Sequence, residues 1–193
     1  DGSSEWLKKY IENNLSKHNE KKLFINLQKN MGKGFASRKG LEAATGDHVL
    51  FQDSDLELDP IDSREMYEIV KKNSTMKVLF GSRFLSGKLR ANSFFINEIF
   101  VRLNSIIFNV LFNQSVTDLH CGTKIIAKEV IKKIKLTIND FGFEIDISSQ
   151  IAKNNFKIYE YGVSYFSRSK LEGKKITWID GILCYYYFFK TRF

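Results

Sequence analysis

The sequence predicts an α/β fold in a single domain over residues 1–193, with a mostly parallel sheet flanked by helices. Short apolar runs alternate with amphipathic segments in the first half of the chain, which is the pattern of a parallel sheet with crossover helices. The chain is 43% hydrophobic with 12 glycines and one proline, which excludes the disordered and fibrous classes. It carries no internal repeat or proline-rich linker, and its 193 residues suffice for one sizeable core.

The first half of the chain supplies the alternating elements. Ser3 or Ser4 is the expected N-cap of the first helix, and Gly46 ends the second. Asp62 and Glu65 have the spacing of a capping box, which predicts the start of the third helix. The expected strands are 21–27, 48–53 and 76–82, and the expected helices are 5–17, the segment after a glycine-rich turn within 30–46, and 62–73.

The second half of the chain is less regular. Its expected elements are a long helix over 94–112, a turn-rich segment over 113–123, helices near 128–134 and 144–153, short strands within 156–167, and a last helix from 178. The opening Asp1-Gly2-Ser3-Ser4 resembles a turn that follows a strand. We therefore expect the sequence to lack an N-terminal strand-helix-strand unit of its fold.

The net charge is strongly positive. Lysine and arginine number 30 against 22 aspartate and glutamate residues, for a net charge of +8. Such an excess suits anionic partners, namely nucleic acid, nucleotide phosphates or an acidic membrane surface, although solubility alone is the simpler explanation. Cys121 and Cys184 have neither metal-site nor disulfide-framework spacing, which is typical of buried thiols in a reducing compartment.

Two segments are rich in apolar and aromatic residues. The segment 94–112 is interrupted by Glu98 and Arg102, and we interpret it as a core helix rather than a membrane-interface helix. The C-terminal segment 178–193 crowds aromatic residues ahead of cationic ones, so a core helix and a membrane-interface helix both remain open there.

An acidic turn follows the second expected strand. Val49-Leu50-Phe51 leads into Asp53, Asp55 and Glu57 within a few positions. Carboxylates repel one another, but Mg²⁺ is commonly held by one or two carboxylates together with substrate phosphates. The turn therefore predicts a metal–diphosphate site at the carboxyl edge of the sheet. The simpler alternative is a solvated turn that also caps the next helix.

Cationic residues are expected near the same edge. Lys33 lies in Gly32-Lys33-Gly34, a turn that fails as a Walker motif because Phe35 replaces the required Ser or Thr. Arg83 follows the strand 76–82, and the basic run 165–175 contributes Arg168 and Lys170. Cations that converge on a carboxylate–metal site are what a diphosphate leaving group needs. A helix-initiating turn and an ordinary basic loop are the alternatives.

Two further groups of polar residues lie in the second half of the chain. Glu144 and Asp146 follow two aromatics in 141–146, where a carboxylate could face a sugar or simply sit at a helix N-terminus. Asp118, His120 and Cys121 lie too close in sequence, and are too few, to predict a zinc site.

Taken together, these motifs resemble family 2 glycosyltransferases. The motifs, in family order and spacing, are DGSS, NMGKGFASRKGLEAATGDHVLFQDSDLELDP, GSRF, TDLHCGTK, FGFEIDI and YFSRSKLEGKKITWIDGI. They are most similar to the polyprenyl-phosphate hexose synthases, such as dolichyl-phosphate mannose and glucose synthases. The resemblance implies a Rossmann-like GT-A fold and an inverting transfer of a hexose. The implied donor is a nucleotide-diphosphate sugar, UDP-glucose or GDP-mannose, and the implied acceptor is a polyprenyl or dolichyl phosphate.

The resemblance also implies roles for single residues and a cellular place. Glu57 lies where this branch often has Gln. The metal would be Mg²⁺ or Mn²⁺, and the protein would be cytoplasmic, peripheral on the cytoplasmic face of a membrane. Taken with the residue patterns above, the expected residues are Asp55, Glu144 and Arg168 in catalysis; Asp1, Lys33, Asp53 and Arg83 in donor binding; Arg83, Arg90, Arg168 and Lys170 in binding the acceptor phosphate; and Asp53, Asp55 and Glu57 in metal binding.

Two alternatives stay open beside this hypothesis. A family 2 glycosyltransferase acting on a glycan or other hydroxyl acceptor would need a general base, from Glu144 or Asp146. A non-catalytic nucleotide- or nucleic-acid-binding module would fit the charge, but the sequence has no basic stripe interleaved with aromatics and no nucleic-acid motif. We therefore expect no nucleic-acid partner.

Overall fold

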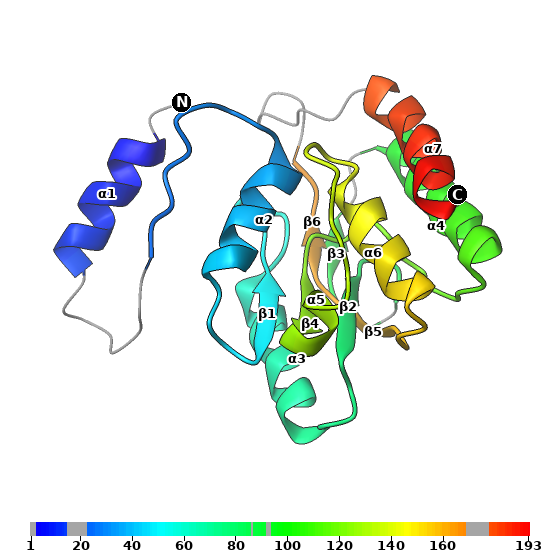
Figure 1. Ribbon diagram of the computed structural model, residues 1–193, viewed down its shortest axis with the longest axis horizontal. Helices are drawn as coiled ribbons and strands as arrows, with labels where there is room; N and C mark the ends of the chain where they lie inside the picture. The colour runs from blue at the N-terminus through cyan, green and yellow to red at the C-terminus, as the bar shows by residue number, and fades with distance from the viewer. Residues whose placement is uncertain (1–2, 15–22, 86, 92–93, 169–177) are drawn as a thin grey trace.

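The protein is described here by a computed structural model that covers residues 3–14, 23–85, 87–91, 94–168 and 178–193 (Figure 1). A four-stranded sheet in the order β1-β4-β2-β5 forms its centre. β4 runs antiparallel to both of its neighbours, while β2 and β5 are parallel, so β1, β2 and β5 all point the same way. The strands are β1 (His48–Phe51), β2 (Val78–Ser82), β4 (Lys124–Ala127) and β5 (Tyr159–Gly162).

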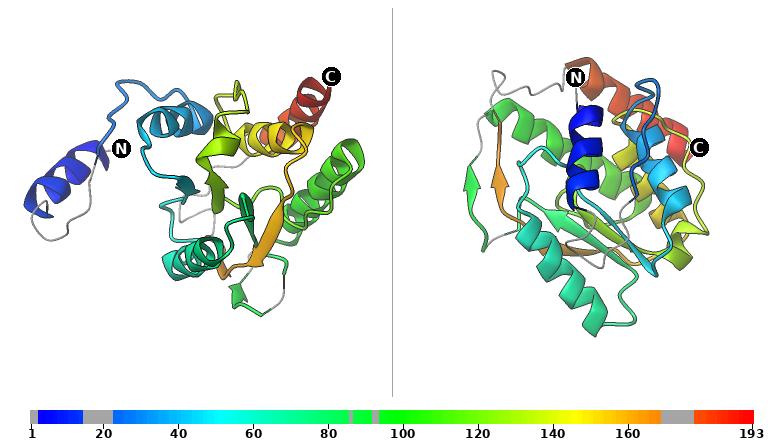
Figure 2. Two further views of the ribbon diagram at one scale, coloured as in Figure 1. Left: turned by 60° about the horizontal axis from the view of Figure 1, so that its bottom comes forward. Right: turned by 90° about the vertical axis from the view of Figure 1, so that its left-hand side faces the viewer.

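A second, two-stranded sheet and the helices complete the described fold. β3 (Arg90–Ala91) pairs in parallel with β6 (Tyr165–Phe166). The first helix stands to one side of the sheet, as Figures 1 and 2 show. The helices are α1 (Ser3–Asn14), α2 (Lys33–Ala43), α3 (Pro60–Lys72), α4 (Phe95–Phe112), α5 (Lys128–Ile131), α6 (Phe143–Lys153) and α7 (Trp178–Arg192).

The central sheet is covered on both faces, and alternation along its strands decides which residue faces which helix. Leu79 of β2 lies in a buried cluster with Met66 and Val70 of α3. Its neighbours Val78 and Phe80 point to the other face, into a cluster with α5 and α6. This burial on both faces explains why β2 carries the apolar run Val78-Leu79-Phe80 and is buried over its whole length.

A further helical layer lies outside α6. Phe108 of α4 and Phe188 of α7 are fully buried in a cluster with Ile145 of α6. α4 and α7 lie side by side there, as Figures 1 and 2 show. The order of layers is therefore α3, sheet, α6, and then the pair α4 and α7.

The structure corrects three details of the expected elements. Residues 23–27 form no strand, and the remainder of the expected strand 21–27 lies outside the described residues. β4 occupies residues 124–127, between the expected turn-rich segment 113–123 and the expected helix near 128–134, where no strand was expected. The N-cap of α3 is Asp59, whose carboxylate accepts from the Ile61 amide at 2.8 Å, with Pro60 in the first turn.

Asp62, which was expected to cap this helix, instead contacts residues outside it. It is buried, accepts a hydrogen bond from the Ser164 amide at 2.6 Å and pairs with Lys88 at 3.0 Å. Asp62 therefore ties α3 to the segment between β5 and β6. The start of α3 does not depend on Asp62, because Pro60 at the first helical position and its cap Asp59 define where the helix begins.

Candidate functional site

Three strands bring the candidate site to one edge of the central sheet. β1 and β2 end there, and β4 begins there because it runs the other way. The register places both Phe51 and Phe80 opposite Lys124. Asp53 after β1, Arg83 after β2 and Lys124 at the start of β4 therefore share this edge, as expected for open α/β sheets.

A chain of four charged groups occupies the buried side of the site. The Lys33 ammonium lies 3.0 Å and 3.1 Å from the two carboxylate oxygens of Asp53. It also lies 2.9 Å from Oε1 of Glu144, whose Oε2 accepts from the buried ammonium of Lys124. Lys124 donates as well to the carbonyls of Leu119 and Cys121. Carboxylates and ammonium groups thus alternate along this chain of contacts, and their two negative charges equal their two positive charges.

These neighbours set the protonation of Glu144. Burial opposes ionisation of its carboxyl, but the ammonium groups of Lys124 and Lys33 outweigh burial and lower the pKa of Glu144 to about 2. Burial also opposes the charge on Lys33, yet Glu144 and Asp53 raise the pKa of Lys33 above its ordinary value. Glu144 is therefore ionised at neutral pH and is a poor proton acceptor there.

Glycines make this arrangement possible. Gly122 lies directly against the Asp53 carboxylate, where any Cβ would overlap Oδ2. Gly34, beside Lys33, lies against the carbonyl of Ile138 in the same way, and Gly32 has φ +91°, a conformation that favours glycine. The start of α2 can therefore reach the segment just before α6, and this places Lys33 between its two carboxylates.

The turn after Asp53 is held by Arg168. Its guanidinium lies 2.9 Å from Oδ2 of Asp55 and 3.3 Å from Oε1 of Glu57. The Glu57 amide donates to Oδ1 of Asp55 at 3.2 Å, and Leu56 between them has φ 62°. Tyr165 donates to Oε2 of Glu57 at 3.2 Å. Glu57 thus anchors the turn to the segment that carries Arg168.

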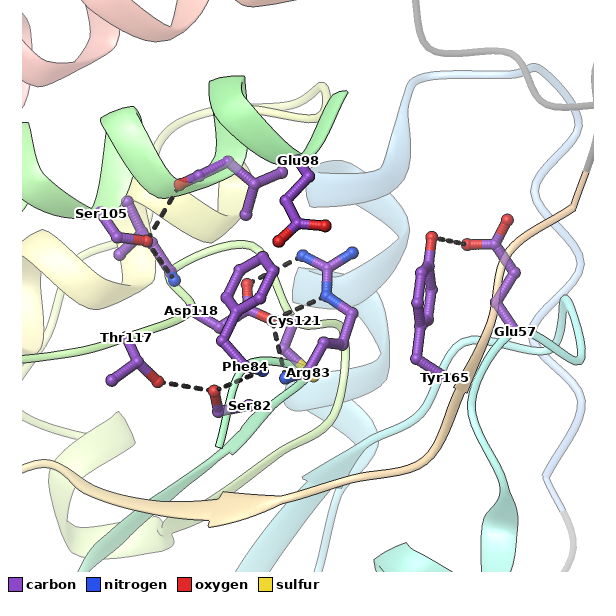
Figure 3. Close-up of polar contacts among 12 residues, drawn as sticks. Glu57, Ser82, Arg83, Phe84, Glu98, Ser105, Thr117, Asp118, Cys121 and Tyr165 are labelled. Carbon is purple, nitrogen blue, oxygen red and sulfur yellow. Dashed lines mark hydrogen bonds and ion pairs between the residues drawn. The ribbon is translucent and has the colours of Figure 1, made fainter. Parts of the chain in front are cut away.

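Arg83 is committed to a buried carboxylate. Its guanidinium makes two hydrogen bonds to Asp118, at 2.7 Å and 2.8 Å, and its amide donates to the same carboxylate at 3.0 Å (Figure 3). Burial opposes ionisation of Asp118, but Arg83 outweighs burial and lowers the pKa of Asp118. This pair joins the end of β2 to the segment before β4.

A run of arginine and aromatic side chains leads from the acidic turn to α4. The Arg83 guanidinium carbon lies 5.0 Å from the centre of the Tyr165 ring and 5.8 Å from that of Phe84, and Figure 3 shows Arg83 beside both rings. Arg90 and Arg102 lie over Phe84 at 4.7 Å and 4.1 Å. We call this run the arginine–aromatic strip; its members are Arg168, Tyr165, Arg83, Phe84, Arg90 and Arg102.

The two arginines at the far end of the strip share one carboxylate. Arg90 pairs with Glu98 at 2.6 Å, and Arg102 pairs with the same Glu98 at 2.9 Å. These three side chains carry a net positive charge. The cationic end of the strip lies at the start of α4, whose remaining outward residues are mostly apolar.

Some of the expected residues lie elsewhere. Asp1 and Lys170 lie outside the described residues. Asp146 is buried and accepts from the amides of Thr137 and Ile138 at 2.6 Å and 2.9 Å, so it holds the backbone before α6. His120 is hydrogen-bonded to Asn104, and burial lowers its pKa to about 4.

Sequence reasoning missed three residues of this site: Lys124, Gly122 and Tyr165. Lys124 and Gly122 stood inside the quoted TDLHCGTK motif, but no role was given to them. A lysine that opens an apolar run is the signal that could have identified Lys124, because a buried ammonium needs a carboxylate partner.

The acidic turn also suits a divalent cation by its chemistry. Asp53 and Asp55 offer hard carboxylate oxygens, and their side chains are 36% and 29% exposed. Among the described residues no group of three or more His, Cys, Asp or Glu side chains is arranged to hold a metal. Two carboxylates fit an ion such as Mg²⁺ that keeps water and substrate phosphates as its other ligands.

A family model and a relative of known name both match this chain. The family model described as glycosyl transferase family 2 matches residues 1–135. A dolichyl-phosphate beta-glucosyltransferase of Dictyostelium discoideum is 25% identical over 183 residues, which is 91% of this chain and 55% of the relative. The chain thus spans about half the length of this relative.

Solved structures show the same fold. Glucosyl-3-phosphoglycerate synthase from Mycobacterium tuberculosis in complex with UDP matches with a TM-score of 0.63 and 15% identity, over 83% of this chain and 55% of that one. The same synthase in complex with Mn²⁺, UDP and phosphoglyceric acid matches with a TM-score of 0.62 and 14% identity, over 83% of this chain and 54% of that one. At this identity the likeness concerns the fold alone.

Proposed function

This chain belongs to glycosyl transferase family 2, and from that premise we propose that it transfers a hexose from a nucleotide-diphosphate sugar to a polyprenyl phosphate. Its fold is the expected GT-A fold of the solved synthases that it resembles. The name of the Dictyostelium relative, a dolichyl-phosphate glucosyltransferase, supports a lipid phosphate as acceptor and glucose as the hexose. The donor is then UDP-glucose, with GDP-mannose as the alternative.

The arginine–aromatic strip is the observation that carries this proposal. It begins at Arg168, which pairs with Asp55, and it ends at Arg90 and Arg102 beside α4. A lipid phosphate needs cations for its head group and apolar surface for its tail. The strip offers the cations, and the outward face of α4 offers the apolar surface.

The state of Glu144 favours a phosphate acceptor over a hydroxyl acceptor. A hydroxyl nucleophile needs a general base, and a carboxylate with a pKa of about 2 is a weak one at neutral pH. Asp146 is occupied with backbone amides. A phosphate monoester has a second pKa of about 6 and is already ionised, so it can attack without a base.

Asp53 and Asp55 would hold the divalent ion, Mg²⁺ or Mn²⁺. The chemistry that such an ion supplies when bound is neutralisation of the charge that develops on the diphosphate as the sugar leaves. Arg168 keeps the acidic turn in place, and its partly exposed guanidinium would also contact a phosphate. The Glu57 carboxylate is paired with Arg168 and accepts a hydrogen bond from Tyr165, and these contacts stabilise the turn.

The transfer itself is an inverting displacement. An oxygen of the acceptor phosphate forms a bond to the anomeric carbon of the hexose, and the bond from that carbon to the diphosphate oxygen breaks. The nucleoside diphosphate leaves with the electron pair. Glu144 remains charged throughout and positions the Lys33 ammonium.

We further propose that the protein lies on the cytoplasmic face of a membrane through α4 and α7. Of the described helices, α4 is long and apolar enough to cross a membrane by length and composition, and 22% of it is buried. Its C-terminal half packs against the domain through Asn104, Ser105, Phe108 and Phe112, which favours lying in the interface over spanning. Outward apolar residues of α4 are Phe95, Ile96, Ile99, Phe100, Leu103, Ile106 and Val110.

α7 fits the same surface. Tyr186 and Phe189 are exposed, whereas Phe188 between them is fully buried. Lys190 and Arg192 follow in the last turn. An exposed aromatic surface with cations beside it is suited to an anionic lipid surface.

A donor and acceptor screen tests the proposed function. The protein is incubated with radiolabelled UDP-glucose or GDP-mannose and Mn²⁺, with and without polyprenyl phosphate. We expect radiolabel to enter the organic phase only when polyprenyl phosphate is present, and from one donor much more than the other. Organic-phase counts that do not depend on the lipid would contradict the acceptor, and label transferred only to a water-soluble hydroxyl acceptor would favour the alternative transferase.

A further inference from the structure

Lys33 occupies the site proposed for the metal from the side of α2. Its ammonium contacts both oxygens of Asp53, at 3.0 Å and 3.1 Å, and Oε1 of Glu144 at 2.9 Å. Asp53 is one of the two carboxylates proposed to hold the divalent ion. One monovalent cation, the Lys33 ammonium, therefore contacts both oxygens of that carboxylate.

The two lysines of the site differ in how firmly they are held. Lys124 is 1% exposed and bonded to Glu144 and to two backbone carbonyls, those of Leu119 and Cys121. Lys33 is 26% exposed, and within the part of the chain that the structure describes its ammonium is bonded to the carboxylates of Asp53 and Glu144, of which Glu144 also binds Lys124. Glu144 therefore keeps a cation when Lys33 leaves, and Lys33 is the exchangeable member of the pair.

A divalent ion at Asp53 changes the balance of charge around Lys33. Like charges at contact distance repel, and the repulsion is stronger where water is partly excluded. The ion must therefore compete with the Lys33 ammonium for the Asp53 oxygens. A diphosphate beside the ion offers the displaced ammonium a new anionic partner.

We propose that Lys33 is an exchangeable counter-ion that couples metal binding to donor binding: it competes with the metal for Asp53 until a diphosphate accepts its ammonium. The proposal rests on the proposed function, because it takes the metal site and the nucleotide-sugar donor from there. Without the donor the site disfavours the metal, and with the donor Lys33 changes from competitor to ligand of the phosphates. Coupling of this kind is reciprocal, so the metal must strengthen donor binding by the same factor.

The position of Lys33 in α2 allows this exchange. It is the first residue of the helix, between Gly32 with φ +91° and Gly34, and its aliphatic chain is partly exposed. The ammonium can therefore move between Asp53 and a neighbouring phosphate by rotation of its side chain alone. A helix N-terminus beside the phosphate adds favourable electrostatics.

The test measures Mn²⁺ binding by electron paramagnetic resonance of the free ion, with and without saturating UDP. The parent protein is compared with Lys33→Met. Lys39→Met removes the same charge from α2, at a lysine that pairs with Glu42 on the surface, and serves as the matched control. Circular dichroism melts confirm folding, and Lys33→Gln gives the same comparison if the methionine variant does not fold.

In the parent and in Lys39→Met, we expect weak Mn²⁺ binding alone and much tighter binding with UDP. In Lys33→Met, Mn²⁺ alone should bind more tightly, and the enhancement by UDP should shrink on the order of tenfold, within the usual range of coupling between sites. Equal Mn²⁺ affinity in parent and Lys33→Met, with the same enhancement by UDP, would overturn the role of Lys33. A parent protein that binds neither Mn²⁺ nor UDP would instead overturn the proposed donor site.

Discussion

The backbone of Gly122 lies against the carboxylate of Asp53, so closely that a methyl group on Gly122 would overlap Oδ2. Gly122 belongs to the segment that leads into β4, and Asp53 follows β1. Pairing of these two strands therefore sets the place of the first proposed metal ligand. A glycine there is needed for space and not for an unusual φ.

The first prediction concerns this contact. Gly122→Ala should displace the Asp53 carboxylate and weaken Mn²⁺ binding in the presence of UDP by about 10- to 100-fold, the usual cost of disturbing the support of a metal ligand. Isothermal titration with Mn²⁺ measures it. Gly40→Ala is the control, because a Cβ on Gly40 in α2 meets nothing within 4 Å. Equal losses in both variants would show that the contact with Asp53 is not the cause.

The second prediction concerns Asp55. Asp55→Asn keeps the size of the side chain but removes the negative charge, so metal-dependent donor binding should be abolished while the fold stays intact. Asp47→Asn, an exposed aspartate before β1, is the matched control. Donor binding is measured by titration with UDP-glucose and Mn²⁺. If Asp55→Asn binds both as well as the parent, the metal assignment is wrong.

The third prediction separates a positioning role of Glu144 from that of a general base. Because its pKa is about 2, Glu144→Gln should retain the acid limb of the kcat profile, which should follow the acceptor phosphate near its second pKa of about 6. Removing a true base typically costs ~10²–10⁴-fold in rate, and removing a positioning contact should cost less. Disappearance of the limb in the variant would favour a hydroxyl acceptor.

The fourth prediction links the same carboxylate to stability. The pKa of Glu144 is lowered from 4.5 to about 2 by folding, so its ionised form stabilises the protein above pH 4.5. As the pH falls from there toward 2, the unfolded chain takes up the proton first and this contribution is lost. Urea unfolding of parent and Glu144→Gln from pH 6 to 3 measures it. The parent should lose stability more steeply; parallel curves would contradict the buried ion pairs.

The fifth prediction concerns the membrane. Because Phe188 is fully buried, shortening α7 would damage the core, and exposed residues are the ones to change. Ile106→Glu with Val110→Glu, at positions 58% and 77% exposed on α4, should weaken sedimentation with anionic liposomes. Ile61→Glu, on the exposed side of α3, is the control with 63% exposure. Unchanged sedimentation of the folded double variant would exclude α4 from the interface.

The acidic turn and the two apolar helices could be predicted from the sequence because their signals are local. An apolar run followed by Asp53 and Asp55 needs no knowledge of the rest of the fold. The outward face of α4 could not be predicted, because periodicity shows that one side is apolar and not what covers it. The structure leaves much of that side exposed, contrary to the core helix expected for 94–112.

The insertion of β4 between β1 and β2 explains most of what was missed. Strand order is a property of distant pairings, and a four-residue strand has almost no periodic signal of its own. Without β4, neither the contact of Gly122 with Asp53 nor the pairing of Lys124 with Glu144 could be inferred. The Arg83–Asp118 pair, 35 residues apart, depends on the same arrangement.

The chemical form of the acceptor tests the central claim most directly. Phosphorus NMR can follow a polyprenyl phosphate as it is incubated with the protein, Mn²⁺ and the preferred nucleotide sugar. We predict that the phosphate monoester signal is replaced by a phosphodiester signal that couples to the anomeric carbon of ¹³C-labelled hexose, as free nucleoside diphosphate appears in equal amount. Hexose transferred to another acceptor, with the monoester signal unchanged, would contradict it.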